Sequence, residues 1–490
     1  MRSAGVLLPV FSLHNSYGIG SFGRCAYDFV DFLKVSGMKC WQVLPLGPTG
    51  FGNSPYQSSS SMAGNPLFID LELLAKDGVL TETELKAAEV QNPGRVNYDD
   101  LIAPRMELLM GTYERGSRIY EKELEAFRAE NPWLSGFALF TAVKEYYHEQ
   151  PLSAWDEDIR LRKPEALTKY TALLKDRIDR FAWLQFLFFK QWKALKEYAN
   201  KNGIEIIGDL PIYCAPDSAD VWMEPQFYQL NEDLSQRAGA GVPPDAFNED
   251  GQNWGNPLYD WEKIRQDGYG LWIRRIDAVG KLFDRIRIDH FLGIDRYYVI
   301  PAGSETAKIG EWVKGPGMGL ISILNSWFPQ LSFIAEDLGL LQPSTVQLRE
   351  DSGWPGMNVL GFAFDSAGTS DFLPHNYRQN SVCYIGTHDN DTLTGMLYTM
   401  PEKDVAFAMR YLDVDKPGEL PAAVLRAGIS SVSDLFVVQI QDLLGLGSEA
   451  RINEPGTVGP HNWCWRLQEG QLAKLDPSAI KKLLSLYGRA

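Results

Sequence analysis

Eight short apolar segments, most of them separated by stretches of helical periodicity, constrain the fold of this 490-residue chain more than any other feature. Strands that alternate with helices along a chain form parallel sheets, and eight such units close a barrel. We therefore predict an α/β fold, a (β/α)8 TIM barrel, in preference to a doubly wound sheet. The predicted strands are residues 4–10, 40–46, 204–211, 283–291, 332–338, 357–364, 382–387 and 435–440.

Two long segments depart from this alternation, and we predict that they are insertions into a single barrel spanning residues 1–490. Residues 67–200 are mainly helical in pattern, with a capping-box sequence at 81–84 and an amphipathic stretch at 177–198. Residues 213–282 form the second predicted insertion. It contains a polar loop, 241–257, whose Gly, Pro and Trp content is typical of a mobile lid with stacking side chains.

Charge and composition narrow the class of partner. The chain has 47 basic and 63 acidic side chains, a formal charge of −16 and no long basic run, which argues against nucleic acid. No segment approaches the roughly 18 uninterrupted apolar residues of a membrane span. This charge makes a neutral ligand more natural. An aromatic content of 12%, with 14 tryptophans, suggests rings on which a ligand stacks, although most aromatic residues would fill the core. The five cysteines form no CxxC pair, which predicts a reducing, cytoplasmic location and no structural zinc.

Five predicted strands end in an acidic residue. In such barrels the catalytic groups gather at the carboxyl ends of the strands. One acid at that position often only caps the next helix, but five at one mouth would repel each other, a cost that is easier to understand if they share a task. These residues are Asp209, Asp289, Glu336, Asp365 and Asp389.

The charged strand 283–291 suggests how these acids could divide their roles. Its alternation places Arg285, Arg287 and Asp289 on one face, so Arg287 would hold Asp289 ionised, as a nucleophile requires. Glu336, with a pKa raised by a neighbouring carboxylate, would be the acid/base of a pair that cleaves a glycosidic bond. Asp389 would stabilise positive charge on the sugar or bind its hydroxyls. Arg285 would lie deeper in the barrel, beside a buried acid that the sequence does not identify.

Histidines in the same region leave a second chemistry open. His388, beside Asp389, could donate to a sugar hydroxyl or ligate a metal ion, so a metal-dependent hydrolase is the rival hypothesis. The first strand lacks a His-x-His pair, and we predict neither a metal nor another cofactor. His290 alternates away from Asp289 and is predicted to be a packed, structural residue. In the tail 456–466 the tryptophans could close the bottom of the barrel, and Asn462 could serve as a cap.

Seven motifs, in order along nearly the whole chain, resemble those of the amylomaltase family, the 4-α-glucanotransferases or disproportionating enzymes related to α-amylases. They are Ser-Pro-Tyr-Gln at 54–57, Gly-Asp-Leu-Pro-Ile-Tyr at 208–213, the loop 241–257, Arg-Ile-Asp-His-Phe at 287–291, Ala-Glu-Asp-Leu-Gly at 335–339, Thr-His-Asp-Asn at 387–390 and the tail Pro-Gly-Thr…Asn-Trp-x-Trp-Arg at 455–466. Cys214, where a valine is common, and His461, where a smaller residue is expected, depart from the pattern.

The resemblance implies a retaining double displacement on α-1,4-glucans such as maltooligosaccharides and amylose. Asp289 matches the nucleophile, Glu336 the acid/base and Asp389 the stabiliser of the transition state. The glucanosyl unit would pass to the 4-hydroxyl of another glucan. It could also pass to the 4-hydroxyl at the other end of the same chain, which gives large rings. The expected substrate-binding residues, from motif and strand-end positions together, are Ser54, Tyr56, Asp209, Asp245, Trp254, Arg287, Asp365, His388 and Asn462. Of these, Tyr56, Asp245 and Trp254 match glucan-binding positions around the acceptor side and the lid.

Two alternatives use the same residues. An amylase-like hydrolase would share all three acids, because the choice between hydrolysis and transfer depends on whether water or a sugar reaches the glycosyl-enzyme. A non-catalytic glucan-binding protein on an amylase-like barrel would have no reason to retain acids at 289, 336 and 389.

Overall fold

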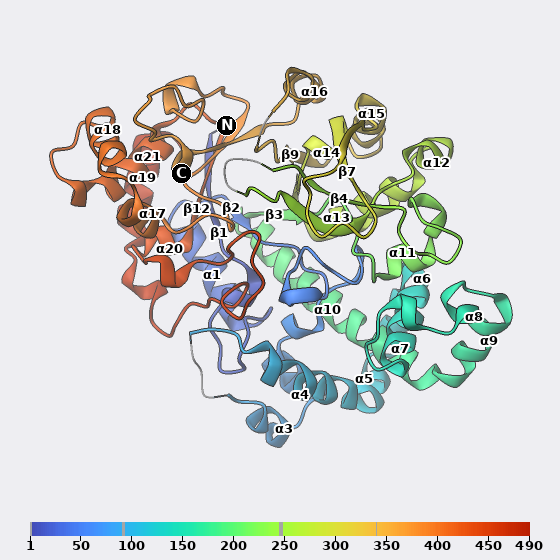
Figure 1. Ribbon diagram of the computed structural model, residues 1–490. Helices are drawn as coiled ribbons and strands as arrows, with labels where there is room; N and C mark the ends of the chain where they lie inside the picture. Colours follow the sequence, from blue (N-terminus) through green and yellow to red (C-terminus); the bar gives the residue numbers. More distant parts are fainter. Residues whose placement is uncertain (1, 91–93, 245–247, 340) are drawn as a thin grey trace.

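Eight parallel strands form the central sheet of the computed structural model, which describes residues 2–90, 94–244, 248–339 and 341–490 (Figure 1). Their order in the sheet is β10-β11-β12-β1-β2-β3-β6-β9. Ala335 N donates to Pro355 O at 2.9 Å and brings the two edges together, so the barrel is nearly closed. The predicted (β/α)8 barrel is therefore confirmed. The strands are β1 (Ser3–Leu7), β2 (Cys40–Gln42), β3 (Glu205–Leu210), β6 (Arg285–Ile288), β9 (Ser332–Ala335), β10 (Gly356–Val359), β11 (Ser381–Tyr384) and β12 (Leu435–Gln439).

Most strands end earlier than their apolar patterns predict. β6 ends at Ile288 and β9 at Ala335, so Asp289 and Glu336 follow directly after the last paired residues. β10 ends at Val359, well before Asp365. The carboxyl end of a barrel strand passes into a loop whose apolar residues still face the core, which is why the pattern extends beyond the ladder.

Helices cover the outside of most of the barrel. β10 and β11 are instead joined, through the fully described segment 360–380, by two 3-10 turns without an α-helix. None of the described helices is both long and apolar enough to cross a membrane. The barrel helices are α1 (Arg24–Val35), α10 (Lys175–Lys201), α13 (Gly270–Leu282), α15 (Met318–Trp327), α16 (Pro343–Ser352), α17 (Leu393–Thr399), α18 (Glu402–Leu412), α19 (Leu420–Ser430), α20 (Ile440–Leu443) and α21 (Pro477–Leu486).

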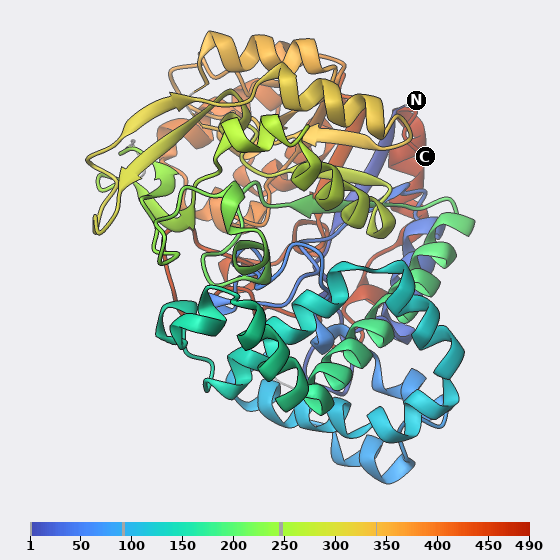
Figure 2. The same ribbon diagram turned by 90° about the vertical axis from the view of Figure 1, so that its right-hand side faces the viewer.

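The segment between β2 and β3 forms a helical lobe on one side of the barrel, and α10 runs from this lobe to the sheet (Figures 1 and 2). The predicted capping box is present, with Thr81 Oγ1 accepting from Glu84 N and Glu84 accepting from Thr81 N. The lobe is bonded to the loop that follows β2, because Gln185 and Gln191 of α10 each pair with both backbone groups of one loop residue, Gly64 and Asp70. The helices are α2 (Leu71–Lys76), α3 (Glu82–Ala87), α4 (Tyr98–Gly111), α5 (Tyr113–Ile119), α6 (Glu121–Glu130), α7 (Trp133–Tyr146), α8 (Glu157–Arg160) and α9 (Pro164–Leu173).

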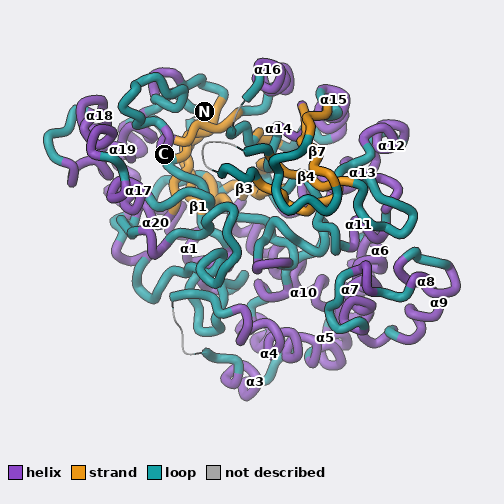
Figure 3. The backbone as a smooth tube through the Cα atoms, viewed as in Figure 1, coloured by secondary structure: helices purple, strands orange, loops and turns teal. Residues whose placement is uncertain are grey.

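A second, antiparallel sheet lies beside the barrel (Figure 3). It contains β4 (Ala238–Val242), β5 (Gln252–Pro257), β7 (Arg296–Pro301) and β8 (Glu311–Lys314), in the order β5-β4-β7-β8. The predicted loop 241–257 is therefore largely a hairpin, and Trp254 lies on a paired strand. Its many glycines and prolines mask the pairing, because they weaken the alternation by which a strand is recognised. Three short helices flank this sheet: α11 (Ala219–Met223), α12 (Trp261–Gln266) and α14 (Leu292–Asp295).

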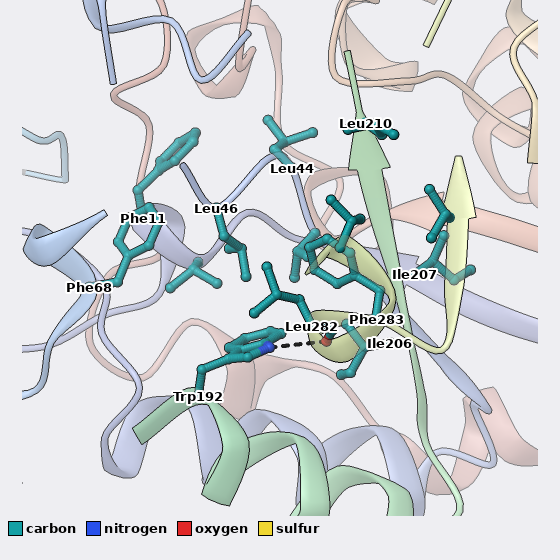
Figure 4. Close-up of a cluster of buried hydrophobic side chains, with 14 of the residues drawn as sticks. Phe11, Leu44, Leu46, Phe68, Trp192, Ile206, Ile207, Leu210, Leu282 and Phe283 are labelled. Atoms are coloured by element: carbon teal, nitrogen blue, oxygen red, sulfur yellow. Dashed lines mark hydrogen bonds between the residues drawn. The ribbon is translucent and has the colours of Figure 1, made fainter. Parts of the chain in front are cut away.

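The aromatic residues of α10 pack in the core, as their helical spacing predicts. Trp183, Phe188 and Trp192 are buried, and the indole N–H of Trp192 donates to Leu282 O at 3.0 Å (Figure 4). Phe283 packs so tightly on β3 that a Cβ added to Gly208 would lie 2.0 Å from its ring. Glycine at 208 is thus required for α10 and α13 to close on the barrel.

Arg285 does not have the buried partner that we expected. Its Nη2 atom lies 2.6 Å from Oε2 of Glu205 at the start of β3, and both side chains are partly exposed. The pair is at the amino end of the strands, away from the acids. On this strand, Arg285 thus lies at the amino end of the barrel, whereas Arg287 and Asp289 lie at the carboxyl end.

A buried arginine ties the two chain termini to the barrel, where they lie close together (Figures 1 and 2). The guanidinium of Arg489 is fully buried and donates to the carbonyls of Ser3, Ile429, Ser431, Ser433 and Asp434. These carbonyls belong to the start of β1 and to the turn before β12. One side chain therefore satisfies the backbone where the first and last strands pair.

We expect Arg489→Met to lower the free energy of unfolding by about 3 kcal/mol, because it leaves several buried carbonyls without donors. Arg410→Met, on the exposed side of α18, is the matched control and should change it by less than about 0.5 kcal/mol. Denaturant unfolding followed by circular dichroism measures both. Equal stability of the two variants would contradict this role.

Candidate active site

A buried arginine at the carboxyl end of β6 organises the barrel mouth. Nη1 of Arg287 donates to both oxygens of Asp209, at 2.8 and 2.7 Å, and to Oδ1 of Asp289 at 2.9 Å. Asp209 and Arg287 are register partners on β3 and β6, which brings their side chains to one face. The exposed fraction of the side chain is 4% for Arg287, 0% for Asp209 and 27% for Asp289. Asp289 is thus the member of this network that solvent can reach.

Tyr56 connects this network to the loop after β11. Its hydroxyl donates to Oδ2 of Asp209 at 2.8 Å, and its ring stacks on His388 with centroids 5.1 Å apart and planes 18° apart. Burial and the charge of Asp209 raise the pKa of Tyr56 well above its ordinary value, so the phenol stays a donor. Burial lowers the pKa of His388, so its imidazole is neutral. Ser54 accepts from Tyr56 N at 3.2 Å and shapes the turn that presents this ring.

Asp389 is held from the segment that follows β12. Asn453 Nδ2 donates to its Oδ1 at 2.7 Å, Arg451 donates to its backbone carbonyl at 2.8 Å, and His388 Nε2 lies 3.4 Å from its Oδ2. Asp442, on α20, accepts from Leu393 N at 2.7 Å and anchors the start of α17. One carboxylate oxygen is therefore fixed by an amide, while the side chain remains partly exposed.

Glu336 is held by backbone amides. Oε2 accepts from His290 N at 2.7 Å and Oε1 from Leu338 N at 3.1 Å. The backbone also bonds to β6 and its end, through Glu336 N to Ile288 O and Phe291 N to Glu336 O. These contacts place Glu336 beside the residue that follows Asp289.

Burial raises the pKa values of both Asp289 and Glu336. For Asp289, Arg287 opposes this rise, and the charges of Asp209, Glu336 and Asp389 add to it. For Glu336, Arg287 and the amide of His290 oppose the rise, and Asp337 adds to it. Of the two acids, Asp289 is the one in direct contact with Arg287, at 2.9 Å, so the guanidinium favours the carboxylate form of Asp289 over that of Glu336.

Trp254 faces this pair from β5. Its ring makes an edge-to-face contact with His290, with centroids 4.8 Å apart at 87°, and lies 6.3 Å from the ring of Tyr213. Gln57, next to Tyr56, donates to Trp254 O at 3.4 Å and to Asn256 Oδ1 at 3.3 Å. The second sheet is therefore joined to the loop after β2 at this point.

Three other predicted residues have different placements. The amide of Asn462 is fully used inside its own loop, accepting from Glu454 N and donating to Thr457. Asp365 is exposed and accepts from Ala367 N in its own turn. Asp245 lies outside the described residues.

Several contacts were not predicted from the sequence. Asn453 and Arg451 precede the recognised tail motif, and no spacing marks them. His290 acts through its amide from a left-handed conformation, φ 53°, which Gly would have signalled more strongly than His does. Trp463 packs near Tyr56 and His388, with centroids 5.7 and 5.9 Å away, so it lies at the mouth and the suggested place at the barrel bottom is wrong.

The arrangement suits acid/base and nucleophilic chemistry on a neutral ligand. Three partly exposed carboxyl groups converge from the ends of β6, β9 and β11: Asp289 is paired with an arginine, Glu336 is held by backbone amides, and Asp389 is held by the amide of Asn453. Within the described ranges, no group of three or more His, Cys, Asp or Glu side chains is placed to hold a metal ion.

Comparison with known proteins shows close relatives along the whole chain. A family model described as 4-alpha-glucanotransferase matches residues 8–473. The 4-alpha-glucanotransferase of Thermus thermophilus is 44% identical over 488 residues, which cover 96% of each chain. That of Clostridium butyricum is 41% identical over 486 residues, covering 98% of this chain and all of the relative.

The fold agrees with these matches. The solved structure of the amylomaltase from Streptococcus agalactiae in complex with acarbose has a TM-score of 0.96 and 38% identity, with both chains fully covered. A family match over most of the sequence, relatives above 40% identity and this shared fold together show that the chain belongs to the 4-alpha-glucanotransferase family.

Proposed function

We propose that this protein transfers segments of α-1,4-glucans to the 4-hydroxyl of an acceptor glucan or glucose, with Asp289 as nucleophile, Glu336 as acid/base and Asp389 as stabiliser. The observation that carries the proposal is the Arg287 network. It fixes and ionises the accessible Asp289 beside a Glu336 whose pKa burial raises. Membership of the 4-alpha-glucanotransferase family supports the reaction, and the amylomaltase complex with acarbose supports the substrate class.

The reaction proceeds in two displacements. The Glu336 carboxylic acid donates its proton to the glycosidic oxygen while Asp289 attacks the anomeric carbon, giving a covalent glycosyl-enzyme and releasing the first glucan. The Glu336 carboxylate then takes the proton of the acceptor hydroxyl, which attacks the same carbon and frees Asp289. Asp389 stabilises the positive charge that develops on the sugar ring in both steps. Two inversions give net retention.

The surrounding predicted residues divide into two groups. Asp209 has no exposed side-chain surface, so its role is to hold Arg287, and Tyr56 holds Asp209. Tyr56 and Trp254, which are partly exposed, also offer ring surfaces to the sugar, whereas the buried ring of His388 supports that of Tyr56. Asn462 and Ser54 shape their loops. We place the enzyme in a reducing compartment such as the cytoplasm, which its five free cysteines, four of them buried, support.

Maltotriose incubated with the enzyme should give glucose together with maltodextrins longer than maltotriose. Transfer lengthens one chain for each that it shortens, whereas water as acceptor only shortens them. Chromatography of the products over time measures this. Glucose and maltose without longer chains would replace the proposal with an amylase-like hydrolase.

Asp289→Asn should lower transfer from maltotriose by about 1,000-fold or more while glucan binding is largely retained, because the variant keeps the shape but loses the nucleophile. Asp415→Asn, an exposed site in the bend between α18 and α19, should retain full activity. Initial rates and calorimetric titration with maltooligosaccharides measure the two effects. Substantial transfer by Asp289→Asn would remove Asp289 from the mechanism.

The pH dependence of kcat/KM should be bell-shaped. Activity requires Glu336 protonated, so it falls as pH rises through a pKa that burial and Asp337 raise, and it falls in acid as Asp289 takes a proton. Asp337→Asn removes a negative charge that raises the pKa of Glu336, so the basic limb should move to lower pH. Asp351→Asn, exposed on α16, is the control. A basic limb that stays in place or moves to higher pH in Asp337→Asn would contradict the assignment.

A further inference from the structure

His290 connects the two sides of the site that the mechanism uses. Its backbone N–H donates to Oε2 of Glu336 at 2.7 Å, and its ring meets Trp254 edge to face at 4.8 Å. It directly follows Asp289 in the chain.

The backbone of His290 is in a conformation that ordinary residues avoid. Its φ of 53° lies in the left-handed region, which costs of order 1 kcal/mol for a non-glycine residue and more for a β-branched one. This conformation turns the N–H toward Glu336, immediately after the extended strand that presents Asp289. Strained residues at functional sites persist when the surroundings fix them.

The ring of His290 is an apolar contact. Burial lowers the pKa of His290 to about 4, so the ring is neutral at ordinary pH, and its Nε2 is buried with no hydrogen-bond partner among the described residues. Ile212 and Tyr213 crowd the same space, since a Cβ on Gly293 would touch both of them and the histidine ring. Packing against Trp254 therefore positions the ring, and the ring in turn positions Trp254.

We propose that His290 is a positioning residue. Its backbone N–H holds the carboxyl group of Glu336 and its ring holds the ring of Trp254, so that these two side chains keep a fixed position relative to each other. This rests on the proposed roles of Glu336 and Trp254. The donated hydrogen bond favours the carboxylate form of Glu336, which is the form that must accept the proton of the acceptor hydroxyl.

The two parts of the proposal separate by substitution. His290→Asn tolerates the left-handed backbone and keeps the amide on Glu336, but removes the ring. His290→Val disfavours that backbone and removes both contacts. The charged groups that face Glu336 and Asp289, and that remain in both variants, are Arg287, Asp337, Asp209 and Asp389. A shift of the basic limb that appears in His290→Val but not in His290→Asn therefore comes from the loss of the backbone amide contact.

The ring contact predicts an effect on the acceptor. In His290→Asn the KM for glucose as acceptor should rise roughly three- to ten-fold, the usual strength of an aromatic pair, and hydrolysis should gain relative to transfer. Trp254→Ala should raise this KM in the same way. The double variant should show no further rise, because both substitutions remove the same contact. An unchanged KM and product ratio in His290→Asn, or additive losses, would overturn the ring part.

The backbone contact predicts an effect on pH. The basic limb of kcat/KM should keep its place in His290→Asn and move to higher pH in His290→Val, because loss of a donor to the carboxylate raises the pKa of Glu336. A merely structural role would lower activity without moving the limb. An unmoved limb in folded His290→Val, or a moved limb in His290→Asn, would overturn this part. If the Val variant does not fold, His290→Ala, which lacks the preference of Asn for the left-handed backbone, takes its place, with the same shift expected and the same result overturning it.

Glu336→Gln is measured in parallel to separate the two levels of inference. Retained transfer in that variant would overturn the proposed function itself. An inactive Glu336→Gln together with wild-type behaviour of both His290 variants would overturn only the positioning role of His290.

Discussion

One buried guanidinium, that of Arg287, is the interaction on which the rest of the site depends. It is surrounded by Asp209 and Asp289, and an unpaired charge of either sign at this depth would cost several kcal/mol. The hydroxyl of Tyr56 completes the shell of Asp209. Asp289, the proposed nucleophile, is thus the partly exposed end of a buried network, and Arg287 favours its carboxylate form.

The same network explains how distant parts of the chain are drawn to one rim. Tyr56 comes from the loop after β2, Asp209 from β3, Arg287 from β6, and His388 stacks on Tyr56 from the loop after β11. The segment after β12 joins this rim where Asn453 donates to Asp389. The second sheet joins it where Trp254 of β5 contacts the ring of His290. Each loop is positioned by a partner from a different strand, which holds catalytic groups more firmly than loops alone would.

Sequence reasoning was most successful for strands and acids, and least for contacts made by loops. The eight barrel strands were predicted because short runs of apolar or alternating residues have a local signature. Asp365 was grouped with the acids of the barrel mouth because the strand before it was drawn too long; the ladder ends at Val359, and the Asp365 carboxylate serves its own turn. The hairpin of β4 and β5 was taken for a loop because its glycines and prolines weaken the alternation, and because the strand β7, which also pairs with β4, is remote in sequence.

By itself the sequence determined the class of fold, the acids that follow the barrel strands and, through the order of its motifs, the family. These follow from residue type and spacing, which are local. Only the tertiary structure decided that Asp209 is buried support, that Glu205 neutralises Arg285, that Asn453 holds Asp389, and that the left-handed His290 gives its amide to Glu336. Such pairings depend on strand register and loop packing, and no residue reveals its partner until the barrel has brought the two together.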